Sequence, residues 1–204
     1  MKYIIGIVLI LVAIASFTKK GTETMQLNKT DTILAFGDSL TYGFGANPHE
    51  SYPTLLSRYS GLKVINAGVN GDTSEEGLRR LPALLNDDSI KVMILFFGGN
   101  DVIQKKPLGA LKNNLKTMIG MAKEKNIDVL LVSVPDITLF GLSALDLYEE
   151  VAAEENTALL SGMLADILSQ PSLKSDQIHP NASGYERIAE RIFEDLKVEG
   201  WIKD

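Results

Sequence analysis

The stretch Ile33-Leu34-Ala35-Phe36-Gly37-Asp38-Ser39-Leu40-Thr41 carries more information about this chain than any other. Four consecutive apolar residues are typical of a strand that is buried on both faces, and the glycine and aspartate that follow favour a turn. Ser39 is therefore predicted to lie where a buried strand ends and a loop begins. A serine in that place is exposed and its backbone N–H is free to bind an anion, as an acyl-transfer nucleophile requires.

Four further apolar runs follow along the chain and predict further strands. They cover residues 63–67, 92–97, 129–134 and, more weakly, 158–160. Their nearly continuous apolar character is typical of a parallel sheet that is covered on both faces.

The stretches between these runs are amphipathic and predict helices. Thr73 and Glu76 form a capping box before a series of leucines at helical spacing, and residues 108–125 and 145–156 show the same periodicity. A second capping box, Ser183 to Glu186, is predicted to open the last helix. The alternation of strands and helices predicts a three-layer α/β/α sandwich with a central parallel sheet of about five strands.

Polar residues follow the first three predicted strands. Ser39 follows the first, the segment 66–74 follows the second, and Asn100 follows the third. Ligands bind at the carboxyl ends of the strands in sheets of this kind. We therefore expect these three segments to meet at one edge of the sheet and to form a site there.

His179 is the candidate general base for Ser39. The chain has only two histidines, and His49 lies in a surface-like turn next to Pro48. Asp176 precedes His179 by three residues, so its carboxylate can accept a hydrogen bond from Nδ1 and leave Nε2 to take the serine proton. A metal site at Asp176 and His179 is not expected, because no third or fourth ligand is in view.

Four segments together resemble the signature blocks of the SGNH (GDSL-type) hydrolase family, and of its bacterial thioesterase, lysophospholipase and arylesterase branch in particular. They are residues 36–41, 66–74, 98–101 and 176–180, and the similarity extends over residues 32–193. The resemblance implies a flavodoxin-like fold and an acyl-enzyme mechanism without a cofactor.

The resemblance also implies a role for each site residue. Ser39, Asp176 and His179 form the catalytic triad, although in some members the aspartate contributes little and a backbone carbonyl orients the histidine. The oxyanion hole combines the backbone N–H groups of Ser39 and Gly71 with the side-chain amide of Asn100. Gly68 is an alternative donor that the family pattern disfavours.

The substrate is the least determined part of the prediction. The loop after the fourth strand is apolar and is expected either to form an acyl-binding wall or to pack on the core. Such a groove suits a medium or long acyl chain, so lysophospholipids, aryl esters and acyl thioesters are the expected small-molecule substrates. The predicted walls of the groove are Ile137, Leu139, Phe140 and Leu142 on one side and Leu40, Tyr42 and Phe44 on the other.

Two other functions remain open at this point. One is a carbohydrate O-deacetylase that uses the same site. The other is a catalytically silent, flavodoxin-like binding module, although Gly43-Phe44-Gly45 does not extend to the glycine-rich phosphate loop that a nucleotide would need.

Composition excludes several classes of function. The chain has a net charge of −6 and no basic run longer than two residues, which argues against nucleic acid as a partner. It has no cysteine, so disulfides, thiolate zinc sites and cysteine nucleophiles are absent. No metal or organic cofactor is implied.

The N-terminal residues are typical of a targeting segment. Residues 1–20 are predicted to be a signal peptide, with a cleavage site at Ala13-Ile14-Ala15, or an uncleaved membrane anchor flanked by Lys2 and Lys19. Either reading predicts export, so the protein is expected to be periplasmic or extracellular, or bound to the membrane through this segment. Residues 21–30 are predicted to be a polar tether, and residues 31–204 the hydrolase domain.

Overall fold

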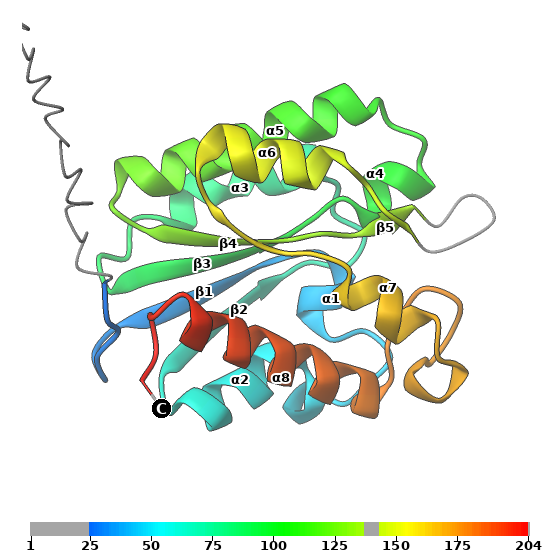
Figure 1. The fold of residues 1–204 in the computed structure, drawn as a ribbon, viewed down its shortest axis with the longest axis horizontal. Helices are drawn as coiled ribbons and strands as arrows, with labels where there is room; N and C mark the ends of the chain where they lie inside the picture. The colour runs from blue at the N-terminus through cyan, green and yellow to red at the C-terminus, as the bar shows by residue number, and fades with distance from the viewer. Residues whose placement is uncertain (1–24, 137–142, 204) are drawn as a thin grey trace, which may run out of the picture.

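The computed structural model of the chain describes residues 25–136 and 143–203 (Figure 1). The predicted signal peptide or anchor and the first part of the tether lie outside the described residues, as does the loop 137–142. In the part that is described, no helix combines the length and the apolar character needed to cross a membrane.

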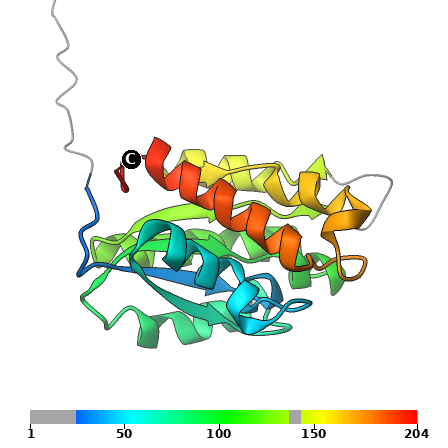
Figure 2. The same ribbon diagram turned by 90° about the horizontal axis from the view of Figure 1, so that it is seen from below.

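A five-stranded parallel sheet forms the centre of the fold, in the order β2-β1-β3-β4-β7. Both faces are covered, because α3, α5 and α6 lie on one side and α2 and α8 lie side by side on the other (Figures 1 and 2). The predicted three-layer α/β/α sandwich is confirmed, and all five strands lie within two residues of their predicted positions. The strands are β1 (Thr32–Gly37), β2 (Lys63–Gly68), β3 (Ile90–Phe96), β4 (Asp128–Val132) and β7 (Ala158–Leu160).

The helices that cover the sheet follow the amphipathic stretches of the sequence. Of the long helices, α2 was not predicted. Helices α5 and α6 match their expected ranges within about two residues, and α3 begins at its predicted capping box. The helices are α2 (Tyr52–Ser60), α3 (Ser74–Leu84), α5 (Leu108–Glu124), α6 (Leu147–Glu155) and α8 (Ala182–Val198).

Shorter elements connect the long ones, and several of them border the site described below. The two-stranded ribbon of β5 and β6 flanks the loop 137–142. These elements are α1 (Ser39–Tyr42), the 3-10 turn Pro48–Glu50, α4 (Gly99–Ile103), β5 (Pro135–Asp136), β6 (Ser143–Ala144), α7 (Met163–Leu168) and the 3-10 turn Pro171–Leu173.

Burial of β1 on both faces explains why its sequence is so strongly apolar. Every residue of β1 is buried, and the Phe36 ring meets the Phe97 ring edge-on at 4.9 Å between centroids. Each such side chain contributes about 1.5–3 kcal/mol when it is withdrawn from water. The strand that ends at Gly37 is therefore held rigidly, which fixes the position of the turn that follows.

Two predictions about helix and domain ends are wrong. Helix α8 begins with Asn181, whose side chain accepts the Gly184 N–H at 3.0 Å, and not with the predicted cap at Ser183. The predicted tether does not extend to residue 30, because Met25 and Leu27 pack against the core and the Leu27 N–H donates to the Trp201 carbonyl at 2.8 Å. The folded part of the chain therefore includes residues 25–30.

The carboxyl ends of β1, β2 and β3 meet at one edge of the sheet, as the parallel register requires. Helices α1 and α4 begin there, next to α7 and to the ribbon that contains β5 (Figure 1). The first described residues lie at the opposite end of the sheet. The topology thus brings the predicted site residues to a single edge.

Candidate active site

Ser39 is the first residue of α1, directly after the end of β1. The Asp38 side chain caps this short helix by accepting the Leu40 N–H at 3.0 Å. Within the described residues, no acceptor is found for the Ser39 N–H. Both the hydroxyl and the N–H of Ser39 are therefore available to a substrate.

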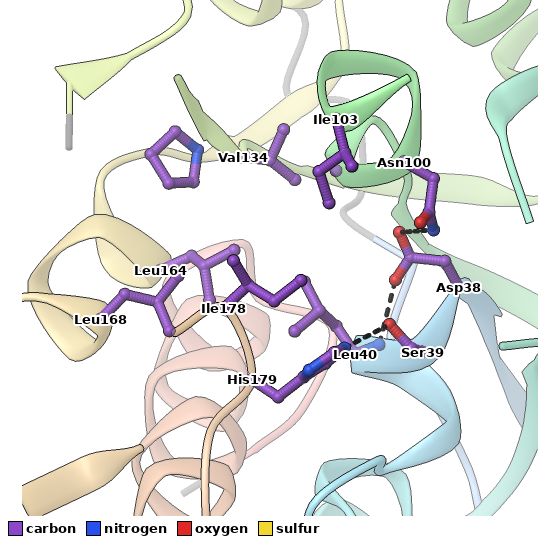
Figure 3. Close-up of a pocket in the computed structure, with 12 residues that line it drawn as sticks. Asp38, Ser39, Leu40, Asn100, Ile103, Val134, Leu164, Leu168, Ile178 and His179 are labelled. Carbon is purple, nitrogen blue, oxygen red and sulfur yellow. Dashed lines mark hydrogen bonds between the residues drawn. The ribbon is translucent and has the colours of Figure 1, made fainter. Parts of the chain in front are cut away.

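His179 lies opposite Ser39, although 140 residues separate them in the sequence. Ser39 Oγ is 3.0 Å from His179 Nε2 (Figure 3). His179 Nδ1 is in turn 2.8 Å from an Asp176 carboxylate oxygen. A proton on Nδ1, held by Asp176, leaves Nε2 as the acceptor that faces the serine hydroxyl. The three side chains thus form a continuous hydrogen-bonded relay.

Asp176 is held in its charged form. Its second oxygen accepts the N–H groups of Ile178 and His179, each at 2.8 Å. Partial burial alone would raise the pKa of Asp176, but these bonds and the one from the His179 ring outweigh it and lower the pKa. Asp176 is the more exposed partner, because 45% of its side chain is accessible against 15% for His179.

Close packing of two loops brings His179 to Ser39. Gly45 has φ +93°, and a Cβ on it would stand 2.2 Å from Ser175 Oγ in the loop that carries His179. The neighbouring Phe44 ring lies 4.6 Å from the His179 ring, and the Tyr185 hydroxyl donates to the Phe44 carbonyl at 2.7 Å. A side chain at position 45 would therefore push the two halves of the site apart.

Of the predicted oxyanion donors, Gly71 lies in the loop after β2 and Asn100 lies in α4, which begins shortly after β3. The Asn100 amide donates to Asp38 Oδ2 at 3.3 Å and to the Asp72 carbonyl at 3.0 Å. Gly71, next to Asp72, has φ +84°, a backbone conformation that favours glycine. A Cβ at this position would meet no atom within 4 Å, so the backbone conformation and not the space explains the glycine. Gly68 serves a different purpose, because its N–H donates to Asn66 and a Cβ on it would stand 2.0 Å from the Tyr42 nitrogen.

Charged side chains fix the Gly71 loop and α4. Arg80 donates to Asp72 at 2.7 Å and to the Gly37 carbonyl at 2.9 Å, which ties the Gly71 loop to the end of β1. Asp101 is buried and accepts both the N–H and the hydroxyl of Ser74, at 2.8 and 2.6 Å. Helix α4 and the start of α3 are thereby joined, and Asn100 has a rigid support.

Asp38 is an unusual carboxyl group. It is 1% exposed, and its burial, together with the negative charges of Asp101 and Asp72, raises its pKa from the usual 3.8 to about 7 despite the Leu40 N–H bond. The pKa of Asp38 is higher in the folded state than in the unfolded state. Its contribution to the free energy of unfolding is therefore complete below about pH 4 and is lost as the pH rises towards 7.

The replacement Asp38→Asn should reveal this effect in the free energy of unfolding. The rise from 3.8 to about 7 corresponds to about 4 kcal/mol, so the wild type should lose about that much more stability than the variant between pH 4 and pH 8. Urea unfolding of both proteins across this range measures the difference. Parallel pH profiles would show that Asp38 keeps an ordinary pKa.

An apolar pocket of about 40 Å³ opens next to Ser39 and His179 (Figure 3). Its walls come from α4, β5, α7 and the loops around them, and Leu164 and Leu168 of α7 point into it. The lining residues are Asp38, Ser39, Leu40, Gly99, Asn100, Ile103, Val134, Pro135, Leu164, Leu168, Ile178 and His179.

The structure places only part of the predicted acyl-binding wall at this pocket. Leu40 lines it, as expected. Tyr42 and Phe44 do not: Tyr42 is 53% exposed at the end of α1, and Phe44 lies against the His179 ring. Ile137, Leu139, Phe140 and Leu142 lie outside the described residues, and Gly71 is not among the residues that line the pocket.

The walls that the sequence interpretation missed are contributed mainly by Ile103, Val134, Leu164, Leu168 and Ile178. Helix α7 carried a usable signal, since the apolar residues from 163 to 168 recur at the i, i+3 and i+4 spacing of a short amphipathic helix. Within residues 25–136 and 143–203, no cluster of three or more His, Asp or Glu side chains is arranged to hold a metal ion.

Comparison with known proteins identifies the relatives of this chain. Residues 35–187 match the model of the GDSL-like lipase/acylhydrolase family. The chain is 31% identical to Esterase TesA of Pseudomonas aeruginosa over 84% of this chain and 90% of that protein. It is 30% identical to Thioesterase 1/protease 1/lysophospholipase L1 of Escherichia coli K12, over 85% and 87%.

Solved structures agree with the sequence relationship. A crystal structure of TesA superposes with a TM-score of 0.73 at 28% identity and covers 83% of this chain and 99% of that one. The lipase/acylhydrolase from Enterococcus faecalis gives a TM-score of 0.69 at 26% identity, over 85% and 97%. With its serine, histidine and aspartate in one relay at the sheet edge, the chain belongs to the GDSL-like lipase/acylhydrolase family.

Proposed function

We propose that this protein is a serine esterase that hydrolyses carboxylic esters of short acyl chains. The observation that carries the proposal is the relay from Ser39 Oγ through His179 to Asp176, with distances of 3.0 and 2.8 Å, at the mouth of an apolar pocket. A nucleophile, a base within hydrogen-bonding distance and a group that orients the base are the three parts that acyl transfer requires.

The reaction follows from these positions. Ser39 Oγ attacks the ester carbonyl carbon while His179 Nε2 takes the hydroxyl proton, and the C–O bond to the leaving alcohol breaks as His179 returns that proton to it. Water then attacks the acyl carbon while His179 Nε2 takes its proton. The bond from that carbon to Ser39 Oγ breaks as His179 gives the proton to Oγ, and the carboxylic acid leaves. The Ser39 N–H, the Gly71 N–H and the Asn100 amide are the proposed donors to the oxyanion in both halves of the reaction.

The size of the pocket argues for a short acyl chain. The described walls enclose about 40 Å³ beside Ser39 and His179, which favours burial of a short acyl chain. A longer acyl chain would extend beyond the described walls. Lysophospholipids, aryl esters and acyl thioesters stay among the proposed substrates, because relatives of this chain are named for them.

Hydrolysis of p-nitrophenyl acetate, butyrate, octanoate and palmitate by the full-length chain tests the proposal. Each buried CH₂ is worth about 0.8 kcal/mol, so kcat/KM should rise roughly 10-fold from acetate to butyrate and then level off or fall. Leu164→Ala enlarges the pocket and should move the optimum towards octanoate. Val198→Ala, at an 81% exposed residue of α8, should leave the profile unchanged.

Three outcomes would contradict the proposal in different ways. An optimum at palmitate would show that this pocket does not limit the acyl chain. Activity confined to acetate would favour the carbohydrate O-deacetylase. Activity no higher than that of Ser39→Ala would favour a silent binding module.

A further inference from the structure

Both N–H groups of the Asn100 amide are already hydrogen-bonded in the resting site. An amide NH₂ group carries two hydrogens. Its nitrogen donates to Asp38 Oδ2 at 3.3 Å and to the Asp72 carbonyl at 3.0 Å. An oxyanion can therefore be bound by this amide only if one of the two bonds is given up or shared.

The bond to Asp38 is the weaker of the two by length. At 3.3 Å it lies beyond the usual range of about 2.7–3.2 Å for N–H···O bonds, whereas the bond to the Asp72 carbonyl lies within it. Asp72 is itself held by Arg80 at 2.7 Å. The amide is thus anchored on the Asp72 side and can exchange its partner on the Asp38 side.

Asp38 is rigidly placed between the two parts of the site. Its Oδ1 accepts the Leu40 N–H at 3.0 Å in the turn that carries Ser39, and its Oδ2 faces the Asn100 amide (Figure 3). The side chain is only 1% exposed, so water does not compete for these bonds. A single buried carboxyl group therefore joins the nucleophile turn to the proposed oxyanion donor.

We propose that Asp38 is a positioning residue that orients the Asn100 amide in the resting site and is replaced by the oxyanion as the acceptor of one of its N–H groups. Asp38 lines the pocket, but in this scheme it takes no part in the bond changes and acts through Asn100. The inference rests on the proposed esterase function, because it requires an oxyanion to form at this position.

The replacement Asp38→Asn tests the inference in the full-length chain. An asparagine can still cap α1 with its oxygen, but it then turns an NH₂ group towards the Asn100 NH₂ group, which has to rotate away. We expect kcat for p-nitrophenyl butyrate to fall at least about 10-fold, with KM within about 2-fold of the wild-type value.

A double-mutant cycle separates this role from a general structural one. In the Asn100→Ala background, Asp38→Asn should lower kcat by less than about 3-fold, because the side chain through which Asp38 acts is gone. Asp31→Asn is the matched control: Asp31 is 9% exposed and accepts the Asn28 N–H at 2.8 Å at the other end of β1, so kcat should not change.

Two results would overturn the inference. One is wild-type kcat in Asp38→Asn. The other is an equal loss in both backgrounds, which would mean that Asp38 acts on the Ser39 turn independently of Asn100. If Asp38→Asn does not fold, Asp38→Ser preserves a cap but cannot reach Asn100, and the same cycle applies. Failure of the esterase function itself is distinguishable, since the wild type would then be no faster than Ser39→Ala.

Discussion

Ser39→Ala is expected to lower kcat for p-nitrophenyl butyrate by on the order of 10⁶-fold. The serine and histidine act together, so His179 has no nucleophile to activate once the Ser39 hydroxyl is removed. Within the described residues, the Ser39 side chain makes one hydrogen bond, of 3.0 Å to His179. The free energy of unfolding should therefore change by no more than about 1 kcal/mol.

The measurement combines steady-state hydrolysis with labelling by a fluorophosphonate probe. The wild type should be labelled at Ser39, and Ser39→Ala should not be labelled. Ser60→Ala is the matched control, because the Ser60 hydroxyl donates to the Leu56 carbonyl in α2 and is remote from the site. A purified Ser39→Ala protein that keeps its esterase activity would refute the assignment of the nucleophile.

Asn100→Ala is expected to have the second largest effect. Removal of one oxyanion donor costs about 3–4 kcal/mol in the transition state, so kcat should fall by about 10²–10³-fold. The amide interacts with charge that develops only after attack by Ser39, and KM should therefore change by less than about 3-fold.

The matched control for this prediction is Asn114→Ala. Asn114 donates to the Ser74 hydroxyl at 2.9 Å, in the network that supports α4, but it does not line the pocket. Its loss should reduce stability without a selective effect on kcat. Equal changes in kcat and KM for Asn100→Ala would mean that Asn100 only supports the start of α4.

Much of the fold could be predicted because its causes are local. The apolar run of β1 and the helical spacing of α5 each follow from burial over a few neighbouring residues. The parallel order also follows, since strands linked through helices place their carboxyl ends together. This is why the sequence predicts that Ser39 and Asn100 lie at one edge of the sheet.

Local sequence patterns gave wrong predictions in two situations. In one, two possible helix caps lay close together in the chain, and in the other, a side chain packed against a residue far away in the sequence. Ser183 fits a capping box, yet Asn181 caps α8 because the chain turns there against Leu173, whose carbonyl accepts the Asn181 N–H at 2.9 Å. Phe44 looked like a wall of the substrate groove, yet the positive φ of Gly45 brings it against His179.

By itself, the sequence determined the layered fold, the edge at which chemistry takes place and the residue types of the relay, because strand burial, helix periodicity and turn chemistry act over short distances. The tertiary structure alone decided that Asp38 joins the Ser39 turn to Asn100 and that α7 closes a pocket of about 40 Å³. Both features depend on the contact of segments that are dozens of residues apart. Their distances are set by the packing of the whole core, which no local pattern contains.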